Sequence, residues 1–166
     1  MSSTEPRIDA QLIPILEQVS DPEIPVLTVL DMGVIREAQQ RGNKVYIKLT
    51  PTYSGCPAMD VISDDLKAAL SKHNLEAEVE LVLSPAWSTD WLSEEGKQKM
   101  EEYGIAPPLE ASADKAALLG NEAVVPCTNC RSTNTHLVSQ FGSTACKALF
   151  QCDDCQEPFD YFKCLK

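Results

Sequence analysis

Hydrophobic side chains recur at helical spacing in two segments of the first half of the chain. Residues 8–19 and 57–72 carry apolar positions every three or four residues, which predicts two helices, each with one buried face. Pro14 lies inside the first segment, where it removes a backbone donor and would bend the helix. The buried face of the second helix is expected to consist of Ala58, Val61, Ile62, Leu66, Ala69 and Leu70.

Three further segments, 34–38, 45–49 and 79–83, predict β-strands. Apolar and polar residues alternate in 45–49, which turns one face toward a core and the other toward water. Gly42–Asn43 is typical of a hairpin turn, and the charged segment 93–103 predicts an exposed helix. The expected fold class is therefore α/β (α+β), a small two-layer sandwich with a three-stranded sheet and flanking helices.

A change of composition indicates a second, smaller domain. Six of the seven cysteines lie from Cys127 onward, behind a stretch rich in Pro, Ala and other small residues. We assign 1–104 to the α/β domain, 105–124 to a linker and 125–166 to the second domain. So short a segment buries little core alone, and a bound metal is the usual remedy. Its expected strands are 135–138, 148–151 and 158–162.

The second domain contains two Cys-x-x-Cys pairs, Cys127 with Cys130 and Cys152 with Cys155. Such pairs form tight turns that bring four thiolates to one tetrahedral metal ion, which predicts a small zinc-ribbon domain. The full thiolate set leaves no open position for water, so the zinc would be structural. An iron centre with the same ligands, or no metal at all, remain alternatives.

Three other residues could add to this site. Cys146 and Cys164 could ligate a metal or could be small buried hydrophobic residues, and the sequence does not decide between these roles. His136 lies between the two pairs, where it could be a ligand or an ordinary hairpin residue.

Cys56 is the one cysteine of the first domain, and it stands between a predicted strand and a predicted helix. With Pro57 at the first helical position, Cys56 would cap the helix, where the helix dipole favours a thiolate. Acidic residues in the first turns oppose this effect, and a lone cysteine here can also be a packing residue. Asp21, Glu23 and Asp31 could converge near Cys56, although turn formation and solvation explain them equally well.

Charge and composition exclude several classes of function. The chain has 166 residues and a formal net charge of −11, which disfavours binding to nucleic acid or to an anionic membrane. No apolar run approaches the roughly 20 residues needed to span a bilayer, and the first residues do not resemble a signal peptide. We therefore expect a cytoplasmic protein. Trp87 and Trp91 could either form a docking surface or cap the core.

The chain resembles the iron–sulfur assembly domain of cluster-maturation factors in three segments: DPEIPVLTVLDMGVI, TPTYSGCPAMDVI and SPAWSTDWLSEEGKQKMEEYGIAPP. Its tail, VPCTNC followed by FGSTACKALFQCDDCQEPFDYFKC, resembles that of family members of phenylacetate degradation. The resemblance implies that Cys56 is the functional thiol and that Asp21, Glu23 and Asp31 support it. It also implies a structural Zn²⁺ and a transient iron ion or iron–sulfur cluster.

The function implied by this resemblance is that of an accessory protein and not of an enzyme. It would help to deliver or insert an iron–sulfur cluster into a client of the multicomponent phenylacetyl-CoA epoxidase, with the reductase component as the expected client. Because one thiolate cannot hold a cluster alone, a homodimer is one expected arrangement. The alternatives are a non-catalytic adaptor that docks on the oxygenase subunits through its zinc ribbon, and a redox enzyme that pairs Cys56 with Cys146 or Cys164.

Overall fold

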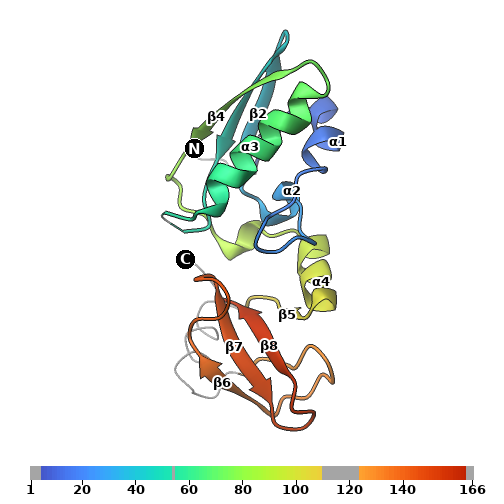
Figure 1. The fold of residues 1–166 in the computed structure, drawn as a ribbon, viewed down its shortest axis with the longest axis vertical. Coiled ribbons are helices and arrows are strands. Elements are labelled where there is room, and N and C mark those ends of the chain that lie inside the picture. The colour runs from blue at the N-terminus through green and yellow to red at the C-terminus, as the bar shows by residue number, and fades with distance from the viewer. Residues whose placement is uncertain (1–4, 54, 110–123, 164–166) are drawn as a thin grey trace. The chain divides into compact units, whose positions relative to one another are not determined.

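The computed structural model describes residues 5–53, 55–109 and 124–163, and it separates into two compact units. The first unit is Met1–Gly96 and the second is Lys97–Lys166. The division falls inside helix α4 (Glu94–Tyr103), which ends at Gly104 as its sequence predicts. The mixed α and β fold class is confirmed, and each unit is described below by itself (Figure 1).

A four-stranded sheet forms the centre of the first unit, in the order β1-β2-β3-β4. Strands β2 (Ile35–Arg41) and β3 (Lys44–Leu49) make the predicted antiparallel hairpin, with Gly42 in the left-handed region at a φ of 65°. Strand β4 (Glu76–Leu81) lies parallel to β3, and the two-residue strand β1 (Arg7–Ile8) lies parallel to β2.

Strand β1 is absent from the sequence prediction, so the expected count of three strands is one too low. The carboxylate of Asp9 accepts a hydrogen bond from the backbone N–H of Gln40 at 2.8 Å, which holds this segment beside β2. Ile8 therefore belongs to the sheet and not to the first helix. The helical part is limited to η1 (Ala10–Leu12) and α1 (Ile13–Leu16), where Pro14 is tolerated in the first turn.

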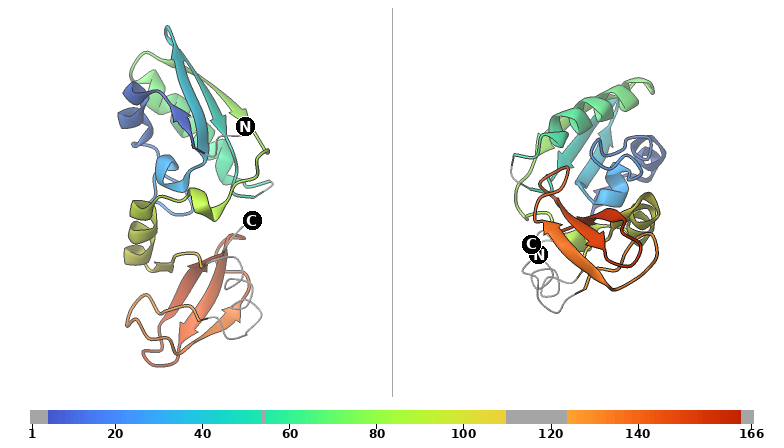
Figure 2. Two further views of the ribbon diagram at one scale, coloured as in Figure 1. Left: turned by 180° about the vertical axis from the view of Figure 1, so that it is seen from behind. Right: turned by 60° about the horizontal axis from the view of Figure 1, so that its bottom comes forward.

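Helix α3 (Ala58–Ser71) covers one face of the sheet (Figures 1 and 2). Val45, Ile47 and Leu49 of β3 are buried as their alternation predicts, whereas Tyr46 on the other face is exposed. The prediction that Val61 lies on the buried face of α3 is wrong, because this residue is 46% exposed. The buried set is Ala58, Met59, Ile62, Leu66, Ala69 and Leu70, which follows the helical repeat more closely.

The loops at one end of this sheet contain two short helical elements, α2 (Val29–Met32) and η2 (Thr89–Trp91). Helix α2 ends at Gly33, which adopts a left-handed φ of 68°. A Cβ atom at position 33 would lie 2.4 Å from the backbone oxygen of Trp91. Glycine is therefore required here both for the backbone conformation and for the close approach of the two loops.

The second unit contains a small sheet of order β5-β8-β7-β6. The three strands that the sequence predicts are β6 (Thr135–Ser139), β7 (Lys147–Cys152) and β8 (Pro158–Phe162), and they pair antiparallel in the structure. The two-residue strand β5 (Ile105–Ala106) pairs with β8, so this sheet includes the start of the expected linker. The rest of that linker from residue 110 to 123, and also Cys164, lie outside the described residues.

The core of the second unit is small and aromatic. The ring of Phe150 stacks on that of Phe159 at a centroid distance of 6.0 Å and meets Tyr161 edge-on at 5.5 Å. Cys127 and Cys152 belong to the same buried cluster. Within the part of the chain that the structure describes, no helix is long and apolar enough to cross a membrane.

Candidate metal centre and candidate thiol site

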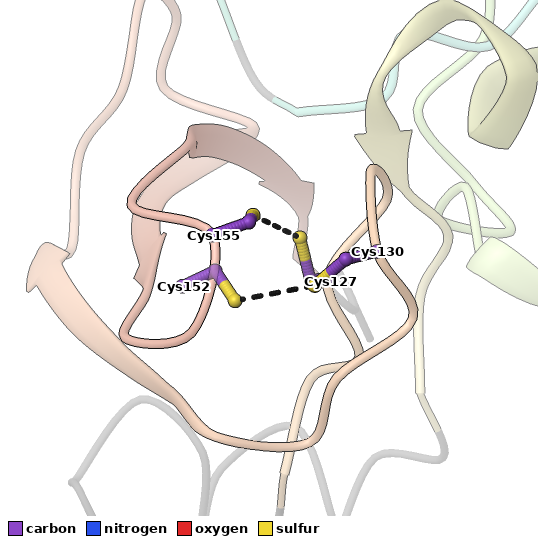
Figure 3. Close-up of side chains that lie close together, drawn as sticks. All are labelled: Cys127, Cys130, Cys152 and Cys155. Carbon is purple, nitrogen blue, oxygen red and sulfur yellow. Dashed lines mark hydrogen bonds between the residues drawn. The ribbon is translucent and has the colours of Figure 1, made fainter.

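The four cysteines of the two Cys-x-x-Cys pairs meet at one point of the second unit (Figure 3). Their sulfur atoms all lie within 4.8 Å of one another, with 3.7 Å between Cys127 and Cys155 and 3.6 Å between Cys130 and Cys152. A tetrahedral ion bound at about 2.3 Å would separate its sulfur ligands by about 3.8 Å. The geometry therefore fits a four-thiolate zinc site before any ion is added.

The two pairs are held by equivalent turns. The residue after each pair, Arg131 or Gln156, has a left-handed φ of 65° or 67°. The backbone N–H of each donates to the carbonyl oxygen of the first cysteine of its pair, at 3.0 Å in both cases. Because the two turns have the same geometry, each can direct both of its cysteine side chains toward the same point. Two segments that are separated in sequence thereby build one set of metal ligands.

The surroundings of Cys155 and Cys130 shift the pKa values of these two thiols in opposite directions. The backbone N–H of Glu157 and the side chain of Asn129 lower the pKa of Cys155 to about 7. The backbone N–H of Ser132 acts to lower the pKa of Cys130, but desolvation and the neighbouring thiols outweigh it and raise that pKa to about 12. Metal-bound cysteines are thiolates, so binding of a cation to this site would release protons.

His136 and Cys146, the other metal-ligand candidates among the described residues, are not part of the cluster. His136 Nδ1 lies 3.0 Å from a carboxylate oxygen of Asp153. Cys146 is 3% exposed, and its sulfur lies 3.0 Å from the hydroxyl of Thr144. Among the described residues, the grouping that could hold a metal ion is therefore made of the four paired cysteines.

Cys56 lies in the loop that leads into α3, and its side chain is 8% exposed. Pro57, and not Cys56, occupies the capping position. The hydroxyl of Thr52 lies 3.9 Å from the sulfur. Burial raises the pKa of the Cys56 thiol above its ordinary value, and it outweighs the hydrogen bonds from the Ala58 backbone and the Tyr53 side chain, which lower the pKa. The negative charge of Glu23 makes a smaller contribution that also raises it. The free protein therefore presents Cys56 as a thiol, contrary to the thiolate that a helix cap would favour.

The three acidic residues singled out in the sequence have different surroundings. One carboxylate oxygen of Asp21 accepts from the backbone N–H groups of Glu23 at 2.7 Å and Ile24 at 2.9 Å, which fixes the turn. Asp31 forms a capping box with Thr28 at the start of α2 and accepts a hydrogen bond from Ser93. Glu23 is the member of this group whose charge acts on Cys56.

The two tryptophans have separate roles. Trp87 is 3% exposed and donates to the backbone oxygen of Met32 at 2.8 Å, so it belongs to the core. Trp91 lines a cavity of about 830 Å³, and the guanidinium of Arg36 lies 3.7 Å from the centre of its ring. Sequence reasoning missed Arg36, because this pairing joins two segments that have no shared motif.

Comparison with known proteins extends these observations. Residues 111–163 match the model of the PaaD zinc beta ribbon domain, and residues 9–81 match that of an iron–sulfur cluster assembly protein. A relative from Escherichia coli (strain K12), provisionally named as one of the subunits of 1,2-phenylacetyl-CoA epoxidase, is 47% identical over 152 residues. The alignment covers 91% of this chain and 90% of the relative. The chain therefore belongs to the PaaD family.

Other relatives match about half of the chain. A Bacillus subtilis protein named Fe-S protein maturation auxiliary factor YitW is 33% identical over 85 residues, which are 49% of this chain and 82% of that protein. A crystal structure of "Domain of Unknown Function DUF59" from Bacillus anthracis has a TM-score of 0.51 at 31% identity, covering 54% of this chain and 88% of that one. The first unit thus has the fold of that domain.

Proposed function

We propose that this PaaD protein is a non-catalytic maturation factor that helps to deliver or insert an iron–sulfur cluster into a client of the phenylacetyl-CoA epoxidase, with the reductase component as the client. The observation that carries the proposal is the pairing of two different thiol sites in one chain. A four-cysteine site suited to permanent zinc lies in one unit, and the single thiol Cys56 lies in the unit that resembles maturation factors.

A single thiol suits transient binding of iron or of a cluster as cargo. Iron would bind Cys56 as a thiolate and displace the proton that burial and Glu23 hold on the free thiol. Ferredoxin-type clusters take four protein ligands, so the others would come from a second copy of the chain or from the client. Incomplete ligation would make the cargo easy to release, as a delivery protein requires.

The acidic residues support this thiol in two ways. Asp21 holds the turn that carries Glu23, and Asp31 ties α2 to Ser93. In this proposal, these hydrogen bonds fix the loops that present Cys56 to its cargo. Glu23 supplies the negative charge that acts on the thiol and could attract an iron cation. Asp21 and Asp31 are thus positioning residues, and Glu23 is the acidic residue that would contact the cargo.

The second unit would carry a structural zinc and dock the client. A zinc ion on Cys127, Cys130, Cys152 and Cys155 would stabilise a sheet whose own core is small. When bound, the ion supplies folding energy and no reaction chemistry. A cytoplasmic location is part of this proposal.

The test is to produce the epoxidase reductase beside the Cys56→Ser variant and to measure its iron and sulfide. We expect the variant to fold normally and the client to lose most of its cluster. Cys146→Ser is the matched control, because this cysteine is equally buried and lies outside both sites. A fully loaded client beside Cys56→Ser would contradict the proposal.

A second candidate function is an adaptor that docks on the oxygenase subunits through its ribbon. It is favoured by the name of the Escherichia coli relative, which describes a subunit and matches over nearly the whole chain. The adaptor would co-purify with the oxygenase at fixed stoichiometry, and Cys56→Ser would not change this. Transient association together with a client that depends on Cys56 favours maturation instead.

A further inference from the structure

The four cysteines of the metal centre differ in their access to solvent. Cys127 is 1% exposed and Cys152 is fully buried, whereas Cys155 is half-buried and Cys130 is exposed. A metal-bound cysteine remains a thiolate, which is the form that reacts with oxidants. Exposure therefore makes Cys130 the first ligand that a dissolved oxidant meets.

A second thiol lies within reach of Cys130. The sulfur of Cys152 is 3.6 Å from that of Cys130, and it belongs to the opposite Cys-x-x-Cys pair. A sulfur atom at this distance can form a disulfide with little movement of the chain, since the turns that carry both cysteines are already side by side (Figure 3).

We propose that Cys130 is a peroxide-modification site, with Cys152 as its resolving thiol, and that their disulfide releases the ribbon's zinc. This inference concerns the second unit and does not depend on the proposed function. In a purely structural zinc site all four cysteines have the same role, whereas here Cys130 is the thiol that reacts with peroxide and Cys152 is the resolving thiol.

The reaction balances in two steps. The Cys130 thiolate attacks hydrogen peroxide, a sulfur–oxygen bond forms as the oxygen–oxygen bond breaks, and the leaving hydroxide takes a proton to become water. The Cys152 thiolate then attacks the sulfenic sulfur, a disulfide bond forms and the second oxygen leaves as water. Two thiolates, one peroxide and two protons give one disulfide and two waters, while the zinc ion keeps its charge and departs.

Loss of these two ligands would affect the fold of the second unit. The two remaining thiolates, of Cys127 and Cys155, cannot complete a tetrahedral zinc site. Cys152 is also part of the buried cluster that contains Phe150 and Tyr161. Replacing its bond to zinc by a disulfide with Cys130 would therefore disturb the core directly. Oxidation should therefore release zinc and loosen the sheet of β5–β8.

Peptide mapping identifies the disulfide that forms first. Trypsin cleaves after Arg131, Lys147 and Lys163, which places the two cysteine pairs in separate peptides. After brief peroxide treatment of the zinc-loaded protein and alkylation, we expect these two peptides to be joined through Cys130 and Cys152. Two separate peptides, each with a disulfide inside one Cys-x-x-Cys pair, would overturn the assignment.

Zinc release, followed with a coloured chelator, gives a second and independent readout. Cys130→His keeps a zinc ligand but removes the exposed thiol, so we expect peroxide-driven zinc release to slow by about tenfold or more. Cys146→Ser is the control and should release zinc at the wild-type rate. The proposal would be refuted if Cys130→His released zinc at the wild-type rate. It would also be refuted if the wild type kept its zinc at a peroxide concentration that fully oxidises a small free thiol. Should Cys130→His not bind zinc, the peptide map of the wild type still decides.

Discussion

Cys56 combines burial with a nearby negative charge, and both act in the same direction on its proton. Burial and Glu23 raise the pKa of this thiol. The roles of the neighbouring acids could not be separated from sequence alone, since turn formation and solvation explain Asp21, Glu23 and Asp31 equally well. The structure distinguishes them, because Asp21 and Asp31 accept hydrogen bonds from backbone N–H groups and a serine hydroxyl.

The raised pKa of Cys56 predicts slow alkylation at neutral pH. Only the thiolate reacts, so the rate with iodoacetamide should lie below that of an unfolded cysteine peptide at pH 7 and rise as the pH increases toward the raised pKa. Glu23→Gln removes the negative charge, lowers the pKa and should increase the rate at a fixed pH. Mass spectrometry of the Cys56 peptide measures both rates. An unchanged rate in Glu23→Gln would show that this charge does not act on the thiol.

Among the helices and strands, those long enough to show a hydrophobic repeat are predictable from the sequence. The β2–β3 hairpin, α3 and the three antiparallel strands of the second unit follow directly from their sequence patterns. Strands β1 and β5 were missed because two residues are too short to show a period, and each depends on a partner strand distant in sequence. The contact of Arg36 with Trp91 is likewise not predictable, because it joins two residues that are distant in sequence.

Gly33 gives a test of the close contact between α2 and η2. In Gly33→Ala, the new Cβ would lie 2.4 Å from the backbone oxygen of Trp91. The substitution would also place an alanine in the left-handed region, which has its own conformational cost. Gly42→Ala is the matched control for Gly33→Ala, because Gly42 has a similar positive φ and an added Cβ there would have no atom within 4 Å.

We expect Gly42→Ala to lower the free energy of unfolding by about 1 kcal/mol, which is the backbone cost alone. Gly33→Ala should lower it by at least about 2 kcal/mol more, because backbone atoms must move. Urea unfolding followed by tryptophan fluorescence measures both values. Equal losses would mean that the two loops are not tightly packed at this point.

At the scale of the whole molecule, the two units divide the cysteine chemistry between them. The four-cysteine cluster was predictable from spacing alone, because two Cys-x-x-Cys pairs specify their own geometry. The function of the first unit was not predictable in this way, since one cysteine in a loop has no spacing to interpret. There the prediction rested on resemblance, which the similarity to maturation factors and the PaaD family now supports.

The most direct test of this division is native mass spectrometry of the protein purified without oxygen and then given ferrous iron and sulfide. We expect one zinc per chain in the wild type and in Cys56→Ser, with iron bound only when Cys56 is present. The zinc should be lost when Cys127 or Cys152 is replaced. Iron in the four-cysteine site, or iron binding that is unchanged in Cys56→Ser, would contradict this division of roles between the two units.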